Sequence, residues 1–348
     1  MSSKISARID VSKIKLPDGF NIEVYANNIE TARQMDFGKN VLFCGSKNGN
    51  IYAIDSNRKV YIIDKELFLP VGVDFYKGDL YVSAVSKILK YEDILNNLNS
   101  PPKPAVVEDS FPKEKHHGWK FIKTGPDGLL YVPVGAPCNV CESEDSRFAS
   151  IMRMNHDGSN LEIYAQGVRN TVGFDWNPQT DVLWFTDNGR DWMGDYKPPD
   201  ELNKASEKGL HFGFPYLHGK NVQVPVYWDK RPDKKFIEPV LNLPAHVASL
   251  GMRFYKAEMF PEYYKDGIFI AEHGSWNRSE KIGYRVSFVK IKNNQVKDYK
   301  IFASGWLQGE DYWGRPADVE IGPEGSLYVS DDYAGCIYRI YYTGEKRK

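Results

Sequence analysis

A short unit, in which a polar turn leads into an apolar or aromatic strand, recurs six times along this chain and narrows the folds open to it. Successive copies begin about 40 to about 85 residues apart, a spacing that suits four-stranded blades with long insertions better than helical solenoid repeats. Apolar periodicity of the helical kind is scarce. The sequence therefore predicts an all-β, six-bladed β-propeller with four-stranded antiparallel blades and long loops on one face. The copies are Lys39–Cys44, Lys77–Val82, Asp127–Val132, Thr180–Phe185, Asp266–Ala271 and Glu324–Val329.

A propeller has to close its ring, because an open ring would leave unpaired strand edges. We expect the strand near residues 20–26 to complete the blade that contains the C-terminal strands Leu327–Ser330 and Cys336–Tyr341. The expected domain boundaries are an N-terminal extension at 1–17, a single six-bladed propeller domain at 18–343 and a basic tail at 344–348.

Two wide insertions interrupt the repeat, at residues 138–150 and 188–235. They are rich in Pro, Gly, Asp and Trp rather than in strand-forming residues, and loops this long are usually functional or disordered. The aromatic residues of the second insertion favour an ordered loop over a binding face.

The four cysteines are too few for a scaffold built on disulfides. For Cys138 and Cys141, which form a single C-x-x-C motif, a local disulfide is favoured over free thiols, and zinc comes last because no second pair is present. Cys44 and Cys336 lie in strand-like runs, where buried and unreactive thiols are expected.

The balance of charge argues against a nucleic-acid partner, because 45 Lys and Arg nearly cancel 46 Asp and Glu. An apolar fraction of 42% is enough for an extensive core. No apolar run approaches the roughly 20 residues needed to cross a bilayer, and Met1–Lys4 lacks the apolar core of a secretion signal. We therefore expect no transmembrane segment, and a protein that is either cytosolic or, if a signal has been removed, periplasmic or secreted.

Polar residues that are unusual inside blades stand just before or after the repeated strands, where a propeller turns its loops toward one end of its central channel. A single His beside a strand is more often a hydrogen-bonded structural residue than a base, and an Arg-Asn pair is more often a loop brace. However, His, Arg and Asn recur at equivalent places in successive blades, so a ring would bring them together. These candidates are His116, His117, Arg169, Asn170, Asn188, His246, His273, Arg278 and Arg315.

Five motifs, in order along the chain, are similar to those of a known family, the pyrroloquinoline-quinone (PQQ)-dependent glucose and sorbosone dehydrogenases, and within it the L-sorbosone and pyranose dehydrogenase branch. The resemblance spans about residues 18–342 and implies a quinone-dependent sugar dehydrogenase. Chance would produce one such motif, but hardly all five in order. The motifs are His117–Cys141, Gly167–Gly173, Asp187–Asp191, Pro199–Pro215 and His273–Arg278.

The resemblance implies that His117 is the general base, which takes the proton from a sugar hydroxyl while a hydride passes to the quinone. An imidazole suits this role because its ordinary pKa lies near working pH, but a second group has to aim its ring. In the glucose dehydrogenases an acidic residue stands where this chain has Ala136, so the orientation of His117 has to come from elsewhere. His116 and Trp276 are expected to bind the sugar, and an external cytochrome, quinone or dye is expected to take the electrons.

The quinone carries three carboxylates, so its site needs cations and amide donors, and Arg can pair with a carboxylate through two parallel bonds. The first of two family arginines is Arg315 here, whereas Ala317 replaces the second, and Arg278 is expected to compensate for the missing charge. The resemblance also implies calcium at the backbone carbonyls of Gly189 and Arg190, where the ion would polarise the quinone. The implied cofactor contacts are Arg169, Asn170, Asn188, His246, Arg278 and Arg315.

Two alternatives share the propeller architecture. Calcium-dependent lactonases and esterases hold an axial metal with side chains of Glu, Asn and Asp, and they predict no arginine cluster. The other alternative is a non-catalytic propeller that binds proteins, since a fold does not fix chemistry. The presence of His117, Arg169, Asn170, Arg278 and Arg315 favours the dehydrogenase over both.

Overall fold

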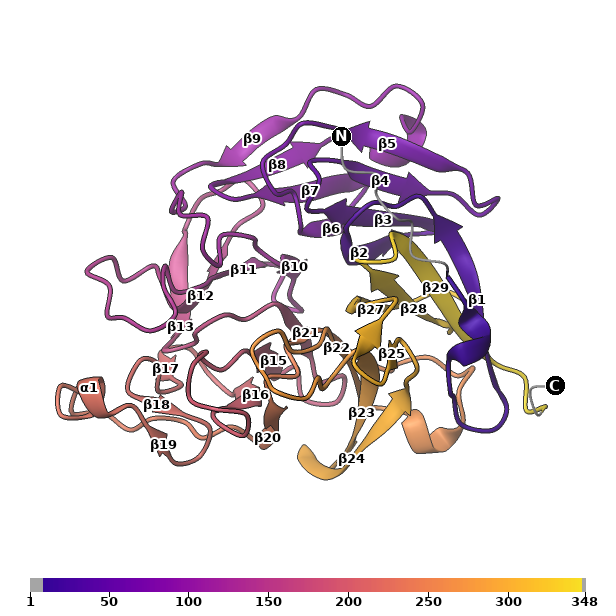
Figure 1. Ribbon diagram of the computed structural model, residues 1–348. Helices are drawn as coiled ribbons and strands as arrows, with labels where there is room; N and C mark the ends of the chain where they lie inside the picture. Colours follow the sequence, from indigo (N-terminus) through magenta and orange to yellow (C-terminus); the bar gives the residue numbers. More distant parts are fainter. Residues whose placement is uncertain (1–8, 346–348) are drawn as a thin grey trace, which may run out of the picture.

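Six β-sheets form a ring in the computed structural model, which describes residues 9–345 (Figure 1). Each sheet is built on four antiparallel strands, and the innermost strands of most neighbouring sheets contact one another. The predicted six-bladed β-propeller is therefore confirmed. No helix within the described residues is long and apolar enough to cross a membrane.

The first three blades follow one another along the chain. Blade 1 consists of β2 (Ala32–Gly38), β3 (Val41–Ser46), β4 (Ile51–Ile54) and β5 (Val60–Asp64). Blade 2 consists of β6 (Val73–Tyr76), β7 (Asp79–Ala84), β8 (Lys87–Tyr91) and β9 (Ala105–Glu108), with the short helix η2 (Ile94–Asn96) between its last two strands. Blade 3 consists of β10 (Lys123–Thr124), β11 (Leu130–Val134), β12 (Ser150–Met154) and β13 (Glu162–Gln166).

The other three blades include one strand from the opposite end of the chain. Blade 4 consists of β14 (Gly173–Trp176), β15 (Leu183–Asp187), β16 (Pro199–Ala205) and β20 (Leu241–Ala245). Blade 5 consists of β21 (Ser249–Phe254), β22 (Ile268–Glu272), β23 (Arg285–Lys292) and β24 (Gln295–Ala303), with η3 (Glu262–Tyr264) after its first strand. Blade 6 consists of β27 (Pro316–Ile321), β28 (Leu327–Asp331), β29 (Cys336–Tyr342) and β1 (Phe20–Asn27).

The repeated sequence unit forms the second strand of every blade, namely β3, β7, β11, β15, β22 and β28. Neighbouring blades cover both faces of these strands, which explains why they read as continuous apolar runs. In β15, for example, every residue from Leu183 to Asp187 is buried. The outer strand β5 instead exposes Val60 and Ile62 and buries Ile63, because only one of its faces meets the core.

The ring closes through the N-terminal strand, as predicted. β1 pairs antiparallel with β29 and so becomes the fourth strand of blade 6. Its buried residue Phe20 makes edge-to-face contacts with Phe260, Tyr264 and Phe302, which belong to blade 5 and its loops. Two ends of the chain that are far apart in sequence therefore share one blade and one core.

Part of the predicted N-terminal extension packs on the propeller. Ile14 is buried in the core between blades 5 and 6, and Lys15 forms a bridge to Ser304 just after β24. Residues 1–8 of the extension and residues 346–348 of the predicted basic tail lie outside the described residues.

The wide insertion predicted at 188–235 is not a loop throughout. It contains β16, the third strand of blade 4, whose polar sequence hides its role. It also contains β17, which adds a fifth, parallel strand to blade 3 beside β13. The remaining small elements of the described chain are η1 (Val11–Lys13), β17 (Leu210–His211), β18 (Leu217–His218), β19 (Val222–Gln223), α1 (Pro225–Trp228), β25 (Leu307–Gln308) and β26 (Asp311–Tyr312).

The centre of the ring is filled by residues of the inner strands and of the segments that lead into them. Contacts among these residues also join neighbouring blades. Val172, Leu250 and Ala317 form an apolar cluster with Trp119 packed against it. A buried carboxylate also links neighbouring blades, since Asp36 of β2 accepts the main-chain N–H of the next blade's β6 at 2.6 Å. The centre of the ring is therefore filled by side chains at this level, and the site lies where the loops leave this packed layer.

Candidate functional site

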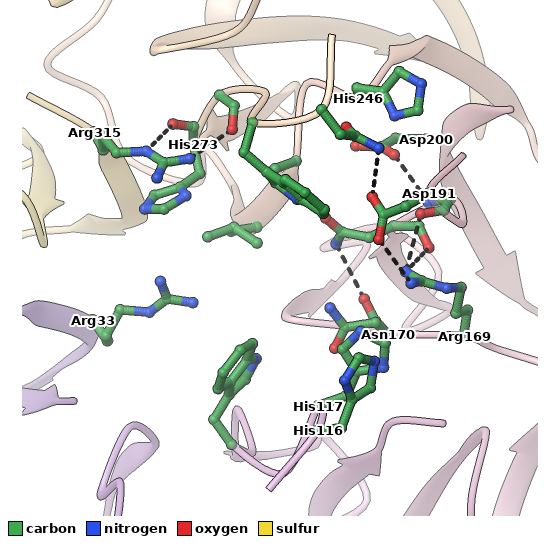
Figure 2. A pocket seen from close by; sticks show the side chains of 18 of the residues that line it. Arg33, His116, His117, Arg169, Asn170, Asp191, Asp200, His246, His273 and Arg315 are labelled. Atoms are coloured by element: carbon green, nitrogen blue, oxygen red, sulfur yellow. Dashed lines mark hydrogen bonds and ion pairs between the residues drawn. The ribbon is translucent and has the colours of Figure 1, made fainter. Parts of the chain in front are cut away.

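A cavity of about 690 Å³ opens among the loops that precede the first strands of the blades and follow their second strands (Figure 2). This volume lies within the range of small-molecule sites. The structure brings most of the predicted site residues together here, although they are spread over two hundred positions of the sequence. The predicted residues that line the cavity are His116, His117, Arg169, Asn170, Asn188, Gly189, His246, His273, Trp276 and Arg315.

The orientation of His117 comes from the main chain. Its Nδ1 lies 2.8 Å from the carbonyl oxygen of Ala136, the position at which the sequence lacks an acidic residue. A carbonyl can only accept, so Nδ1 carries the hydrogen and Nε2 keeps the lone pair. Gly135 allows the close approach, because a Cβ there would lie 2.6 Å from the Cβ of His117.

The surroundings of His117 favour its neutral form. Burial lowers the pKa of His117 well below its ordinary value, and the positive charge of Arg169 and the neighbouring ring of His116 add to this effect. The two histidine rings lie with centroids 4.1 Å apart, and burial also lowers the pKa of His116. This arrangement provides an unprotonated base at neutral pH.

The turn that carries Arg169 and Asn170 is held by a buried carboxylate at the end of β15. Asp187 accepts the main-chain N–H of Arg169 at 2.7 Å and that of Asn170 at 2.6 Å. Burial raises the pKa of Asp187 to about 7. The guanidinium of Arg169 is itself buried, and its Nη1 donates to the carbonyl of Gly189 at 3.0 Å.

The loop after β15 is fixed from several sides. The side-chain amide of Asn188 donates to the carbonyls of Asn170 at 3.1 Å and Ser249 at 2.9 Å. The carboxylate of Asp200 accepts the main-chain N–H of Gly189 at 2.9 Å and that of Ser249 at 3.0 Å. Burial raises the pKa of Asp200 to about 6. Asn188 therefore braces the wall of the cavity with its amide nitrogen.

A second wall of the cavity, formed by blades 1, 5 and 6, carries the sequence candidate His273 together with Arg33 and Lys47, which the sequence analysis missed (Figure 2). Arg33, Lys47 and His273 all contact the buried carboxylate of Asp332, at 3.0, 2.9 and 2.7 Å. Burial alone would raise the pKa of Asp332. The positive charges beside the carboxylate outweigh the effect of burial and hold this pKa well below its ordinary value.

Arg33, and not Arg278, is the further arginine that lines the cavity beside Arg169 and Arg315. In the register of the first two strands, Arg33 of blade 1 occupies the place that Ala317 has in blade 6. Arg278 lies outside the cavity lining, because its Nη1 donates to the carbonyl of Asp195 at 2.7 Å and its guanidinium stacks on Tyr196. The signal that could have found Arg33 is its position near the start of an inner strand. The corresponding position in blade 6 is only two residues after Arg315.

Arg315 offers its charge without a carboxylate partner among the described residues. Its Nε and Nη2 donate to the carbonyls of His273 and Gly274 at 3.1 and 2.7 Å, and the ring of Tyr284 lies 5.2 Å from its guanidinium carbon. Five cationic side chains line the cavity against two carboxylates, those of Asp191 and Asp200. The cations are Arg33, Lys47, Lys115, Arg169 and Arg315.

Two other predicted residues have polar contacts with the loop after β15. The ring of His246 lines the cavity, but its Nε2 lies 2.7 Å from the carbonyl of Gly194 and so holds the loop after β15. Arg190 is absent from the cavity lining among the described residues, and its Nε donates to the carbonyl of Asp191. The rim of the cavity is aromatic, because Trp276 and Trp192 are 64% and 70% exposed and meet edge to face.

The polar groups around the cavity suit an anion better than a cation. The described residues contain no group of three or more His, Cys, Asp and Glu that could hold a metal, and the carbonyl of Gly189 is already engaged by Arg169. The cationic lining instead matches an anion, and the indole N–H of Trp119 is buried in the cavity wall without a partner in the described structure. The lining therefore fits a molecule with several carboxylates, and in this arrangement the Gly189 carbonyl faces Arg169 rather than a cation.

The predicted states of the cysteines are confirmed. Cys138 and Cys141 form a disulfide, which lies in the loop between β11 and β12. Cys44 and Cys336 are free and buried, and burial raises the pKa of Cys44 to about 12.

Comparison with known proteins gives consistent matches. A family model described as Glucose / Sorbosone dehydrogenase matches residues 103–339. An uncharacterized protein of Borreliella burgdorferi is 38% identical over 357 residues, which cover 98% of this chain and 94% of that protein.

Two solved structures share the fold at low sequence identity. The calcium structure of the carbohydrate-active enzyme of family AA12 from Trichoderma reesei is 17% identical with a TM-score of 0.80, covering 95% of this chain and 97% of that one. The PQQ-bound form of the aldose sugar dehydrogenase from Streptomyces coelicolor is 18% identical with a TM-score of 0.69, covering 94% and 100%.

Proposed function

Because the chain belongs to the glucose/sorbosone dehydrogenase family, we propose that it oxidises an aldose, a pyranose or a sorbosone-like sugar with PQQ as the hydride acceptor. One observation carries the proposal. A neutral imidazole, that of His117, lines the same cavity as five cationic side chains that have converged from all around the ring.

The cationic residues suit the three carboxylates of the quinone. Arg33, Arg169 and Arg315 offer planar guanidinium groups, and Trp119 adds an N–H donor that has no partner in the described structure. Asn170, the neighbour of Arg169 in the same turn, also lines the cavity and adds a polar contact. When bound, the quinone supplies a two-electron acceptor for the hydride.

His117 accepts the proton of the sugar hydroxyl at Nε2 while the C–H bond of the same carbon breaks. The bond from Nδ1 to the Ala136 carbonyl keeps the ring in the tautomer that can act as a base. The positive charge of Arg169 disfavours the imidazolium that forms, so the proton is readily passed on to water.

The exposed rim is suited to the sugar and to the external electron acceptor. Trp276 presents an apolar face on which a sugar ring can stack, and His116 lies beside the base with a polar ring. The electron acceptor, a cytochrome, a quinone or a dye, approaches through the same open mouth.

Calcium at the carbonyls of Gly189 and Arg190 stays a prediction, supported by the calcium structure of the fungal neighbour. The guanidinium of Arg169 donates to Gly189, so a cation could bind that carbonyl only after Arg169 turned away. We therefore assign no step of the reaction to calcium.

The disulfide between Cys138 and Cys141 supports a periplasmic or secreted location, because disulfides persist in oxidising compartments. The lactonase alternative is less well supported. It needs carboxylate and amide side chains around an axial metal, whereas five cations line this cavity.

The test is to titrate the purified protein with PQQ, with and without calcium, and to follow the quenching of tryptophan fluorescence. Reduction of a dye is then measured with a panel of aldoses, pyranoses and sorbosone. We expect saturable binding and sugar-dependent dye reduction. A protein that does not bind the quinone would exclude this function and favour a non-catalytic propeller.

A further inference from the structure

Asn139 contacts the buried guanidinium of Arg169 with both its main chain and its side chain. Its carbonyl oxygen accepts from Nε of Arg169 at 2.8 Å, and its side-chain oxygen accepts from Nη2 at 3.0 Å. The carbonyls of Asn188 and Gly189 accept from Nη1 at 3.2 and 3.0 Å. Asn139 thus provides half of the four hydrogen bonds that fix the plane of this guanidinium.

The same side chain also holds the loop after β15. Its oxygen accepts the main-chain N–H of Asp191 at 2.8 Å, and its amide nitrogen donates to the carbonyl of Asp191 at 3.2 Å. The carboxylate of Asp191 in turn lies 3.6 Å from Nη2 of Arg169 and accepts from Asn277 at 2.9 Å. Asn139 therefore links the loop of blade 3 to the loops of blades 4 and 5.

Nothing in the local secondary structure holds Asn139 in place. Residues 135–149 connect β11 to β12 without a helix or a strand. The disulfide between Cys138 and Cys141 closes a four-residue ring that contains Asn139 and Val140. This ring restricts the backbone at the one point where a carbonyl and a side chain have to face the same guanidinium.

A guanidinium that is only 3% exposed needs this support. Its five N–H donors cannot turn to water when a partner is lost, because a buried donor without an acceptor is strongly disfavoured. Without Asn139 the side chain of Arg169 would move to find other acceptors. Its guanidinium would then no longer face the cavity as it does now.

We propose that Asn139 is a positioning residue that aims Arg169 at the carboxylates of the quinone, and that the Cys138–Cys141 disulfide holds Asn139 in this position. The inference rests on the proposed function, since it treats Arg169 as a contact of the quinone. It makes the affinity for the cofactor depend on a disulfide that does not touch the cofactor.

The first test measures the dissociation constant of PQQ by tryptophan quenching, without sugar or dye. Asn139→Ala should weaken binding about tenfold or more, whereas Val140→Ala, in the same ring, should leave it unchanged. In an Arg169→Met background the Asn139→Ala change should cost nothing further, because it acts only through the guanidinium. Equal losses in both backgrounds would overturn the inference.

The second test removes the disulfide. The double variant Cys138→Ser/Cys141→Ser should weaken quinone binding in the same direction as Asn139→Ala, with an unchanged circular dichroism spectrum. Substitution is preferable to a thiol reagent, because thiols react with quinones. Unchanged affinity in this variant would overturn the role of the disulfide.

A measurement on the protein without quinone tests the inference independently of cofactor binding, which a poorly folded disulfide variant could lose for other reasons. The positive charge of Arg169 helps to keep the pKa of His117 low, so its displacement in Asn139→Ala should raise this pKa in an NMR titration. An unchanged titration would count against the inference. If the wild-type protein fails to bind PQQ, the proposed function and this inference both fall. If it binds and Asn139→Ala binds equally well, only the inference falls.

Discussion

The base of the proposed reaction is aimed by a backbone carbonyl, which no side-chain motif could reveal. The identity of His117 as a candidate followed from its place before a repeated strand, but the contact to Ala136 depends on how two loops meet. Any residue has a carbonyl, so the sequence at position 136 says nothing about this role. Arg33 escaped for a related reason, because it belongs to no motif and is recognised only by its register in blade 1.

Removal of the base should separate chemistry from cofactor binding. His117→Ala should lower kcat by about 100-fold or more, because general-base catalysis by a positioned side chain is worth this much, while the dissociation constant of PQQ stays nearly the same. His156→Gln, in which the histidine stacks on Tyr76 away from the cavity lining, is the matched control. A fully active His117→Ala would show that another group takes the proton.

The depressed pKa of His117 should be visible in an NMR titration of its ring. A base whose pKa lies well below 6.5 stays unprotonated when the pH falls, so the His117 signals should move only well below pH 6.5. The kcat/KM profile also contains the buried carboxylates of Asp187 and Asp200, whose pKa values burial raises to about 7 and about 6, so the ring titration is the measurement that isolates the base. A titration of His117 centred near the ordinary pKa of histidine would contradict the assignment.

The three arginines near the site should differ in their effect on the quinone. Arg33→Met and Arg169→Met should each weaken PQQ binding about tenfold or more, because each removes a charge from the cavity lining. Arg278→Met should change it little, since that guanidinium is turned toward Asp195. Fluorescence titration of the three variants ranks them, and a dominant effect of Arg278→Met would restore the role first predicted for it.

The second strand of each blade could be predicted from the sequence, whereas β16 could not, and both outcomes have the same physical reason. A strand covered on both faces is normally apolar, and β15 follows this rule. In β16 the residues Asp200 and Glu201 are buried because they accept main-chain N–H groups from other loops. A sequence of this kind reads as a solvated loop, so the wide insertion hid a strand.

The end of β15 should prove as important as the arginine that it supports. Asp187→Ala leaves the N–H groups of Arg169 and Asn170 without their acceptor, which should cost about 1–3 kcal/mol of unfolding free energy and also weaken PQQ binding. Thermal unfolding and fluorescence titration measure the two effects. Glu207→Ala, at an exposed carboxylate of the same region, should change neither. Loss of stability without loss of affinity would show that the turn does not position the site.

At the scale of the whole molecule, the site exists only because the ring is closed. Arg33 lies near the start of β2 in the first blade and Arg315 just before β27 in the last, so these two arginines line one cavity only because the first and last blades are neighbours. The repeat and its spacing were enough to predict six blades and their closure. The distances across the cavity could not be predicted, because they depend on how the blades pack around the central core.

The seam should therefore control both folding and the site. Phe20→Ala removes a ring that packs on four other aromatic rings and should cost about 3–5 kcal/mol, whereas Asn21→Ala, on the next residue of β1, should cost far less. Deletion of residues 1–26 exposes the edge of β29 and should abolish folding, which circular dichroism and gel filtration measure. If the deletion variant were folded, the restoration of quinone binding by a peptide of residues 18–28 would still show that β1 completes the site. A deletion variant that folds and binds PQQ without the peptide would mean that blade 6 needs only three strands.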